Sequence, residues 1–415
     1  MRIAASLFHL TATLVATALA ALEGCAVTPL PAPAPAEFSA VTTNASTQWI
    51  IRLKPGISPT KYAQQSGLRY VRSIGAGMHR YAGASPLRAL QTTPGAVWVE
   101  ADHPVRAPRI DGQDIKARPI ARTVSYGPND PLLPAQYSYH TLNADRFWLK
   151  QTGTPNCVVA IIDSGIDARH PDLQGACVPG WDLTVTPPQS GGLEDPYGHG
   201  THVAGIVGAR TNNAIGIAGL APGCKLLPVK IFNQFGHSTA GITAEAIVWA
   251  VDHGAKVINC SWGTPLPGEA TMEAVRYAME KDVVVVAASG NSGKNDGLNY
   301  PAAQDGVIAV AASTDIDGWA SFSTWGDWVD LAAPGESILS TFPTARGTGY
   351  RLMRGTSMAA PHVTAAAALL RSDNPALTQA QVADVLYSTA KDIVRSGFDP
   401  YSGHGRVDPA RALGL

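Results

Sequence analysis

Short, unbroken apolar runs alternate with longer helical patterns from residue 128 onward. The apolar runs predict strands at 158–162, 225–231, 257–259, 283–288 and 307–311, and the longer patterns predict helices at 202–209, 238–253 and 269–281. Strands without polar alternation are typical of a parallel sheet that is buried on both faces. The pattern therefore predicts a doubly wound, mainly parallel α/β domain at 129–415, with ligands beyond the carboxyl ends of the strands.

The part of the chain before residue 106 has its own set of shorter predicted strands and helices. Residues 46–105 predict strands at 48–53, 70–74, 78–81 and 97–100, and helices at 59–66 and 87–91. About 60 residues is near the minimum size for a self-supporting core, so this is a small α/β domain. Residues 106–128 carry five basic side chains among Pro and Gly, which predicts an open linker and a zone for proteolytic cleavage.

The first 24 residues have the pattern of a signal peptide, with Arg2 followed by an apolar run at 4–22. Residues 18–20 suit an ordinary signal peptidase, whereas 22–25 resemble a bacterial lipobox that would place a lipid on Cys25. The uninterrupted apolar core is shorter than the roughly 20 residues of a membrane-spanning helix. We therefore expect an exported protein, secreted or periplasmic or lipid-anchored, with a Pro/Ala linker at 25–45.

Composition narrows the function classes. The 415 residues are 45% hydrophobic and 15% charged, as in a globular protein, and the net charge of −1 gives no reason to expect a nucleic acid or an anionic membrane as partner. Export permits disulfides. If Cys25 is lipidated, four cysteines remain, which allow three full pairings that the sequence leaves open: Cys157, Cys177, Cys224 and Cys260.

Three residues together predict nucleophilic chemistry. Ser357 stands at the start of an apolar helix, in the field of the helix N-terminus; Asp163 follows a strand; and His199 enters a helix. Each has an ordinary interpretation as a cap or turn residue. Their order, Asp, then His, then Ser, is that of subtilisin-type triads.

Four motifs occur in that order over 129–415: Asp-Ser-Gly at 163–165, His-Gly-Thr-His at 199–202, Ser-Gly-Asn at 289–291 and Gly-Thr-Ser-Met-Ala at 355–359. With this spacing the chain resembles the subtilisin-like serine proteases, the subtilases, and among them the thermitase group. The resemblance implies a serine endopeptidase that hydrolyses polypeptides through an acyl-enzyme and acts as a monomer.

The same resemblance implies the roles of the site residues. Ser357 would be the nucleophile, His199 the general base rather than its neighbour His202, and Asp163 the residue that orients His199. Asn291 and the backbone N–H of Ser357 would bind the oxyanion.

Substrate recognition is expected to use the backbone, by addition of the peptide as a strand. The segments implied on its two sides are Ser261, Trp262, Gly263 and Gly236, His237, Ser238, with residues 287–290 and Asn299 at the first pocket. Since no buried acid is evident for a basic P1 residue, we expect an apolar or aromatic one.

Calcium is a second implication of the resemblance. Three chain segments match the strong site of the thermitase group, and calcium prefers six to eight oxygens. The implied ligands are the side chains of Asp130, Asp172 and Asn213 and the carbonyls of Arg210, Ile215 and Ile217. The alternative is an Asp-Pro turn beside an Asn-rich loop.

Residues 46–105 end in a segment that resembles the close of the subtilase propeptide, so we expect a ferredoxin-like domain that inhibits the enzyme within the same chain.

Two other functions have to be weighed. One is a catalytically silent subtilase fold that only binds; the four intact motifs oppose it. The other is an esterase, whose Gly-x-Ser-x-Gly motif is absent here because Ala359 occupies the last glycine position.

Overall fold

The computed structural model describes residues 47–114 and 127–415. The signal peptide, the Pro/Ala linker, Cys25 and the middle of the cleavage zone lie outside these residues. Within them, no helix is long and apolar enough to cross a membrane.

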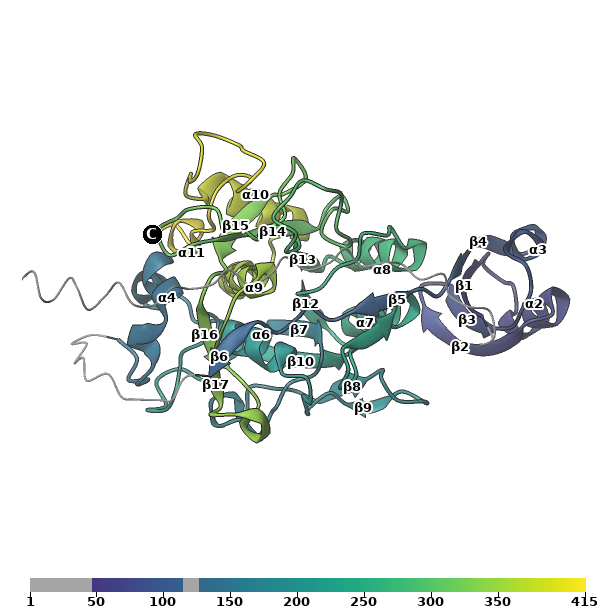
Figure 1. The fold of residues 1–415 in the computed structure, drawn as a ribbon, viewed down its shortest axis with the longest axis horizontal. Helices are drawn as coiled ribbons and strands as arrows, with labels where there is room; N and C mark the ends of the chain where they lie inside the picture. The colour runs from purple at the N-terminus through teal and green to yellow at the C-terminus, as the bar shows by residue number, and fades with distance from the viewer. Residues whose placement is uncertain (1–46, 115–126) are drawn as a thin grey trace, which may run out of the picture. The chain divides into compact units, whose positions relative to one another are not determined.

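An eight-stranded sheet forms the centre of residues 127–415 (Figure 1). Seven of its strands run parallel, and β9 pairs antiparallel with β8 at one edge. In spatial order the strands are β15 (Leu331–Pro334), β14 (Ile308–Ser313), β13 (Val284–Ala288), β12 (Ala255–Cys260), β7 (Val158–Asp163), β10 (Lys225–Lys230), β8 (Gly180–Asp182) and β9 (Gln189–Gly191). The predicted parallel α/β domain is confirmed.

Both faces of the sheet are buried because successive side chains of each strand enter different cores. In β7, Val159 and Ile161 join the core beneath α6 and α9, whereas Ala160 and Ile162 join the core beneath α7 and α8. The first face is covered by α6 (His199–Gly208), α9 (Thr356–Asp373) and α10 (Gln379–Thr389), with α4 (Tyr137–Thr141), α5 (Ala144–Phe147) and α11 (Pro409–Ala412) around them. The second is covered by α7 (Ala240–Asp252) and α8 (Glu269–Glu280).

Helix α9 begins at Thr356, so Pro361 lies inside it, beyond its first turn. Proline has no N–H to donate to the carbonyl four residues earlier, which here is that of Ser357. That carbonyl instead accepts a hydrogen bond from Ser261 Oγ at 2.8 Å. A proline at this position therefore frees the Ser357 carbonyl for a contact just beyond the end of β12.

A separate four-stranded antiparallel sheet precedes this domain in the chain. Its spatial order is β2 (Arg69–Gly75), β3 (Met78–Ala82), β1 (Gln48–Leu53) and β4 (Ala96–Ala101), with helices α2 (Pro59–Ser66) and α3 (Leu87–Thr92). This is the order of a ferredoxin-like βαββαβ unit, as predicted. Tyr62, Tyr81 and Leu90 fill its own core, while Ile50 and Met78 on the other face join the core beneath α7 and α8.

The end of β4 contacts the N-termini of α7 and α8. Glu100 Oε2 accepts from the N–H of Ala270 in α8 at 3.0 Å, and Asp102 Oδ1 accepts from the N–H of Gly241 in α7 at 2.8 Å. Carboxylates are favourable at helix N-termini because the free N–H groups and the helix dipole are positive there. Arg72 adds an ion pair to Glu245 of α7 at 2.6 Å.

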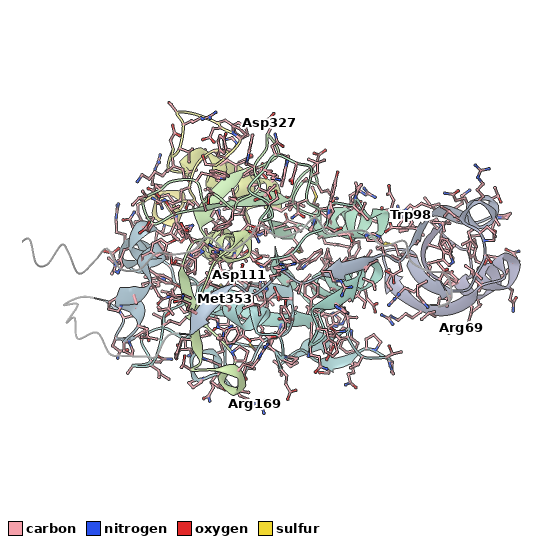
Figure 2. The ribbon with its side chains drawn as sticks, viewed as in Figure 1. Arg69, Trp98, Asp111, Arg169, Asp327 and Met353 are labelled. Atoms are coloured by element: carbon pink, nitrogen blue, oxygen red, sulfur yellow. The ribbon has the colours of Figure 1, made fainter. Side chains whose placement is uncertain are left out.

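One short strand ends at the first residue of the predicted open linker, 106–128, and another lies within it. β5 (Pro104–Arg106) pairs antiparallel with β11 (His237–Thr239), and β6 (Gly112–Asp114) pairs antiparallel with β17 (Tyr350–Met353), which itself pairs with β16 (Ile338–Thr341). Figure 2 labels Asp111, which precedes β6, and Met353 in β17. Backbone pairing orders this segment despite its polar, Pro-containing composition.

Candidate active site

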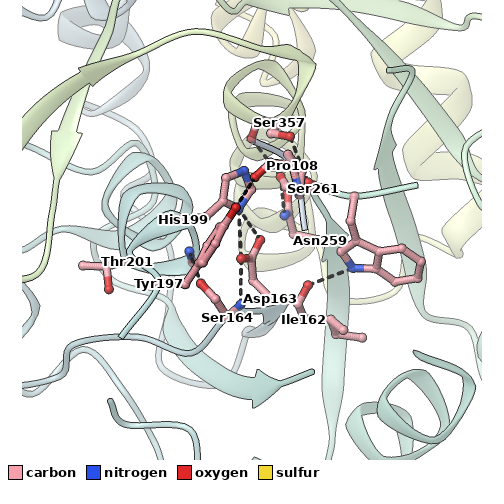
Figure 3. Close-up of polar contacts among 12 residues, drawn as sticks. Pro108, Ile162, Asp163, Ser164, Tyr197, His199, Thr201, Asn259, Ser261 and Ser357 are labelled. Carbon is pink, nitrogen blue, oxygen red and sulfur yellow. Dashed lines mark hydrogen bonds and ion pairs between the residues drawn. The ribbon is translucent and has the colours of Figure 1, made fainter. Parts of the chain in front are cut away.

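Asp163 and His199 form a buried pair at the carboxyl end of β7 (Figure 3). Nδ1 of His199 lies 2.9 Å from each carboxylate oxygen of Asp163, and the two side chains are 1% and 0% exposed. Asp163 Oδ1 also accepts from the N–H of Ser164 at 2.7 Å. Because Nδ1 is held by the carboxylate, Nε2 is the ring atom left for proton transfer, and it has no partner among the described residues.

His199 is the first residue of α6, three residues before the predicted helix start. Gly200 allows this helix to approach β7, since a Cβ there would lie 2.2 Å from the carbonyl oxygen of Gly165 and 3.0 Å from Cβ of Asp163. The Gly200 N–H donates to Ser164 Oγ at 2.9 Å. The close contact of helix and strand sets the distance between the imidazole and the carboxylate.

Asp195 fixes the N-terminus of α6 and was not predicted from the sequence. It is buried; one carboxylate oxygen accepts from the N–H of Gly198 at 2.7 Å, and the other accepts from the N–H and the hydroxyl of Thr201 at 2.8 and 2.7 Å. Burial raises the pKa of Asp195. The available signal was an aspartate four residues before His199, which is common in ordinary turns.

Ser357 is the second residue of α9 and is almost fully buried. Its hydroxyl donates to the carbonyl of Ser261 at 2.8 Å, and Ser261 Oγ donates to the carbonyl of Ser357 at the same distance. Asn259 and Thr364 extend this network: Asn259 Nδ2 donates to Ser261 Oγ, and the Thr364 hydroxyl donates to Asn259 Oδ1, each at 2.9 Å. The network ties the end of β12 to the start of α9.

His202 lies on the same helix but in a different environment. It is fully buried, and its Nε2 lies within hydrogen-bond distance of two backbone carbonyls, those of Ile338 at 3.1 Å and Arg351 at 3.0 Å. Burial lowers the pKa of His202 to about 3. The ring of His202 is thus engaged with the backbone, unlike that of His199.

Asn291 is anchored by Thr356. The carboxamide oxygen of Asn291 accepts from the N–H of Thr356 at 2.9 Å and from its hydroxyl at 3.2 Å, while Thr356 Oγ1 accepts from the N–H of Gly290 at 3.0 Å. With its oxygen fixed in this way, the amide nitrogen is oriented away from Thr356, and an added Cβ at Gly355 would lie 3.4 Å from it. Thr356 was not singled out from the sequence.

The predicted substrate-binding segments lie around the Asp163–His199 pair and Ser357. Gly236, His237 and Ser238 face the chain's own β5, and the carbonyl of Gly236 accepts from the N–H of Ala107 at 2.8 Å. Past this point, the carbonyl of Pro108 accepts from the hydroxyl of Tyr197 at 2.9 Å (Figure 3). The segment 104–108 therefore occupies the edge at which a substrate strand is expected.

The second predicted segment is more buried than expected. Trp262 is 1% exposed, its indole N–H donates to the carbonyl of Ile162 at 2.9 Å, and it shares a buried cluster with Val105 of β5. Gly263 leaves room for Asn299, whose Nδ2 would lie 2.1 Å from an added Cβ and donates to the carbonyl of Ala288 at 2.9 Å. Trp262 is thus a core residue at the base of this segment.

The six predicted calcium ligands come from segments that the fold brings together. Asp130 and Asp172 are buried; Asp130 accepts from the backbone N–H groups of Asn212 and Asn213, and Asp172 accepts from that of Ile217. Burial is the main cause that raises the pKa of Asp130, and the nearby charge of Asp172 adds to it. Two buried carboxylates that lie near each other fit a cation, whose charge would offset the cost of burying them.

The remaining predicted ligands qualify this fit. Asn213 presents its amide nitrogen to Asp172 at 3.0 Å while its oxygen accepts from the N–H of Ile215, so oxygen ligation requires the amide to turn over. The N–H of Arg210 donates to the carbonyl of Asp172 at 2.6 Å. Over 47–114 and 127–415, no group of three or more His, Cys, Asp or Glu side chains could hold a metal. Amide and backbone oxygens would therefore have to supply most ligands.

A buried Asp–His pair beside a serine at a helix N-terminus, on the carboxyl edge of a parallel sheet, defines a serine hydrolase. The family model described as the subtilase family, peptidase S8, matches residues 154–405. Thermitase from Thermoactinomyces vulgaris is 42% identical over 69% of this chain and 99% of its own length, and subtilisin E from Bacillus subtilis is 37% identical over 83% and 81%. The chain belongs to the subtilase family and is a serine endopeptidase.

Solved structures agree with this assignment. The crystal structure of fervidolysin from Fervidobacterium pennivorans, described as a keratinolytic enzyme related to subtilisin, matches 89% of this chain and 61% of its own, with a TM-score of 0.74 and 29% identity. A protease from Pseudoalteromonas arctica matches 69% of this chain and 99% of its own, with a TM-score of 0.64 and 32% identity.

Proposed function

We propose that this endopeptidase cleaves peptide bonds with Ser357 as nucleophile, His199 as general base and Asp163 as the group that orients His199. The observation that carries the proposal is the Asp163–His199 pair, in which both carboxylate oxygens hold Nδ1 and leave Nε2 without a partner among the described residues. That geometry selects the tautomer able to accept a proton at Nε2 and stabilises the imidazolium that follows.

Ser357 changes its partner during the proposed reaction. Its hydroxyl donates to the Ser261 carbonyl, where it is a weak nucleophile. Rotation of the side chain toward His199 lets Nε2 take the proton as Oγ attacks the scissile carbonyl. His199 then delivers that proton to the leaving amine, and a water repeats the sequence to hydrolyse the acyl-enzyme.

Asn291 Nδ2 and the backbone N–H of Ser357 bind the oxyanion in this proposal. The anchoring of the Asn291 oxygen by Thr356 supports the role, because a fixed donor needs no reorganisation when charge develops. The helix N-terminus at Ser357 adds a favourable field for negative charge.

We propose that polypeptide substrates add as a strand between the segments 236–238 and 261–263, with Asn299 beside the first pocket. The antiparallel pairing of β5 with β11 supports the first segment, since a substrate strand would use the same backbone groups of β11. Ala287 and Ala288 are apolar and buried near this pocket, in keeping with an apolar or aromatic P1 residue.

Residues 46–105 are proposed to act as an inhibitory propeptide, with maturation by cleavage within 106–128 and the peptidase domain at 129–415. The ferredoxin-like sheet, its carboxylates at the N-termini of α7 and α8, and the strand-paired tail support this role. A tail that occupies the substrate edge competes with any other polypeptide.

Calcium is proposed to bind the carboxylates of Asp130 and Asp172, the turned amide of Asn213 and the carbonyls of Arg210, Ile215 and Ile217. The cation would neutralise two buried carboxylates and join the segments that carry them. We also propose that the signal peptide at 1–24 directs export, with or without a lipid on Cys25. The exported enzyme is proposed to be a monomer.

The decisive experiment compares the wild type with Ser357→Ala. We expect a fluorophosphonate to label the wild type at Ser357 and peptide hydrolysis to disappear in the variant, while its far-UV circular dichroism is unchanged. A folded Ser357→Ala protein that retains wild-type turnover would contradict the assignment of the nucleophile. A wild type that neither reacts with the probe nor cleaves peptide would favour the silent, binding-only alternative.

A further inference from the structure

Two cysteines that are 67 positions apart in the sequence (224 − 157) become neighbours in the sheet. Cys157 immediately precedes β7, and Cys224 immediately precedes β10, its parallel neighbour. The register pairs Lys225 with Val158, and the N–H of Lys225 donates to the carbonyl of Cys157 at 3.3 Å. One residue earlier on each strand, Cys224 therefore stands opposite Cys157.

The two side chains point to the same side of the sheet. Both are buried in the core beneath α6 and α9, 3% and 2% exposed. Neighbouring strands lie about 4.8 Å apart, which falls within the ~4.4–6.8 Å that disulfides span between Cα atoms. The interaction between the two thiols raises the pKa of Cys157 and lowers that of Cys224. Both cysteines are reduced in this structure.

We propose that Cys157 and Cys224 form a disulfide bond in the exported protein. The inference rests on the proposed export, because an oxidising compartment is needed, but it is independent of the proposed catalytic roles. The Cys224 thiolate attacks the disulfide of an oxidant of the thiol–disulfide oxidoreductase class and forms a mixed disulfide with one of its cysteines. The Cys157 thiolate then attacks Cys224 Sγ, so that the Cys157–Cys224 bond forms and the cysteine of the oxidant leaves as a thiol. Two electrons reduce the oxidant to two thiols, which take up the two protons released.

The other two described cysteines are placed less well. The backbone of Cys177 pairs with that of Leu226, on the edge of β10 that faces away from β7. Cys177 is therefore offset by two residues from Cys224 and is separated from Cys157 by β10. Cys260 belongs to the core on the other face of the sheet, at the carboxyl end of β12. The fold thus favours a single bond between Cys157 and Cys224 and leaves Cys177 and Cys260 as free thiols.

The pair is covered once folding is complete. A Cβ at Gly153 would lie 2.6 Å from Cys224 Sγ, and Cys224 Sγ is 3.7 Å from the hydroxyl of Ser372 near the end of α9. An oxidant cannot reach thiols buried in this way. The bond must therefore form during folding, after β7 and β10 pair and before the segment at 153 and α9 close over them.

The bond would act on stability and leave the chemistry unchanged. It lies at the amino ends of β7 and β10, whereas Asp163 is at the carboxyl end of β7. The loop that it closes contains Asp163 and His199. Closing a loop of this length restricts the unfolded chain, and strands tied at one end keep their register.

The first test maps the linkage without changing either cysteine. Full-length Ser357→Ala protein, which cannot digest itself, is recovered from an exporting bacterial host, denatured with N-ethylmaleimide but no reductant, digested and analysed by mass spectrometry. We expect a peptide pair joined through Cys157 and Cys224, with Cys177 and Cys260 alkylated. Alkylation of both Cys157 and Cys224, or a bond from either to Cys177, would overturn the proposal.

The second test separates a disulfide from simple packing. Three full-length proteins, all carrying Ser357→Ala so that the N-terminal domain stays attached, are refolded with and without reductant and melted: one with wild-type cysteines, one with Cys157→Ser and, as the matched control, one with Cys177→Ser. Reductant should lower the melting temperature of the protein with wild-type cysteines and of Cys177→Ser by roughly 5–10 °C and leave Cys157→Ser unchanged. An equal effect of reductant on Cys157→Ser would overturn the bond. Peptidase activity is not read, so failure of the catalytic assignment leaves this result intact.

Discussion

Two histidines one turn apart on α6 illustrate how environment divides the roles of identical side chains. His199 contacts a carboxylate and keeps one ring nitrogen without a partner among the described residues, whereas His202 has its Nε2 beside two backbone carbonyls. Burial lowers the pKa of His202 to about 3, so its ring is neutral at neutral pH. Of the two, His199 is the one arranged to exchange protons.

We therefore expect His199→Ala and His202→Ala to differ in kind. The first should lower kcat by about 10⁴-fold or more, the loss typical of serine proteases that lack a triad member, in a protein that stays folded. The second removes a buried ring and should lower stability by about 2–4 kcal/mol, measured by urea denaturation. Equal losses of kcat in two folded variants would leave the base unassigned.

Thr356 makes a sharper test of the oxyanion site. Thr356→Val keeps the shape of the side chain but removes the hydroxyl that contacts Asn291 and Gly290. We expect kcat to fall about tenfold with little change in KM, because the donor loses one of its two anchors. In an Asn291→Ala background the same change should have no further effect on kcat, since interacting residues are not additive. Additive losses would show that Thr356 acts elsewhere.

At the scale of elements, the end of β4 holds the N-terminal sheet against α7 and α8. Glu100 serves two partners there, the N-terminus of α8 and His103, whose Nδ1 lies 3.1 Å from Glu100 Oε1. The hydrogen bond to Glu100 raises the pKa of His103, against the opposing effect of burial. The protonated imidazole is thus more stable in the folded chain than in the unfolded one.

This shift predicts a pH dependence. A histidine with a raised folded-state pKa contributes stability that is fully present below its unfolded pKa, near 6.5, and that is lost as pH rises through the higher folded value. Full-length Ser357→Ala should therefore lose this contribution above about pH 6.5, measured by thermal melts from about pH 5.5 to 8.5. The same melts on Ser357→Ala/His103→Gln should lack it; identical profiles would contradict the role of His103.

The segments that carry the proposed calcium ligands can be tested through Asp172. A ligand bound only by the folded state stabilises it by mass action, so chelation should lower the melting temperature of the protein. Asp172→Asn should remove most of that response, whereas Asp182→Asn, on β8, should keep it. Melting curves that coincide with and without chelator would exclude the proposed site.

At the scale of the whole molecule, strand pairing restricts where the chain can be cut. The tail is paired with β11 up to Arg106 and with β17 from Gly112 onward, so residues 107–111 cross the site between the two pairings. Tyr197 holds the carbonyl of Pro108 in this interval. A chain that both anchors hold in place presents only this short segment to the nucleophile.

We predict that cuts in this interval leave a wild-type species whose first residue lies within 108–112. N-terminal sequencing of the first processed species measures this. Ser357→Ala should remain intact apart from its signal peptide. Purified Ser357→Ala that matures normally in the absence of other proteases would exclude self-processing. A truncated protein that begins at Pro128 and folds as readily as the full chain would remove the role of the N-terminal domain in folding.

The sequence by itself determined the parts that depend on local patterns. Apolar runs located five of the eight strands of the sheet, and β7 and β10 end within one residue of their expected ends; the short strands β8, β9 and β15 were not predicted. The order of Asp163, His199 and Ser357 within recognisable motifs identified the candidate triad. These features could be predicted because periodicity and short motifs are written in consecutive residues.

Only the tertiary structure decided which distant residues meet. Thr356 reaches Asn291 across 65 positions (356 − 291), Asn259 links Ser261 to α9, and Cys157 faces Cys224 rather than Cys177. Each contact is set by strand register and by the packing of helices on the sheet. Their hydrogen bonds join residues with no local signature, so no pattern of neighbouring amino acids could reveal them.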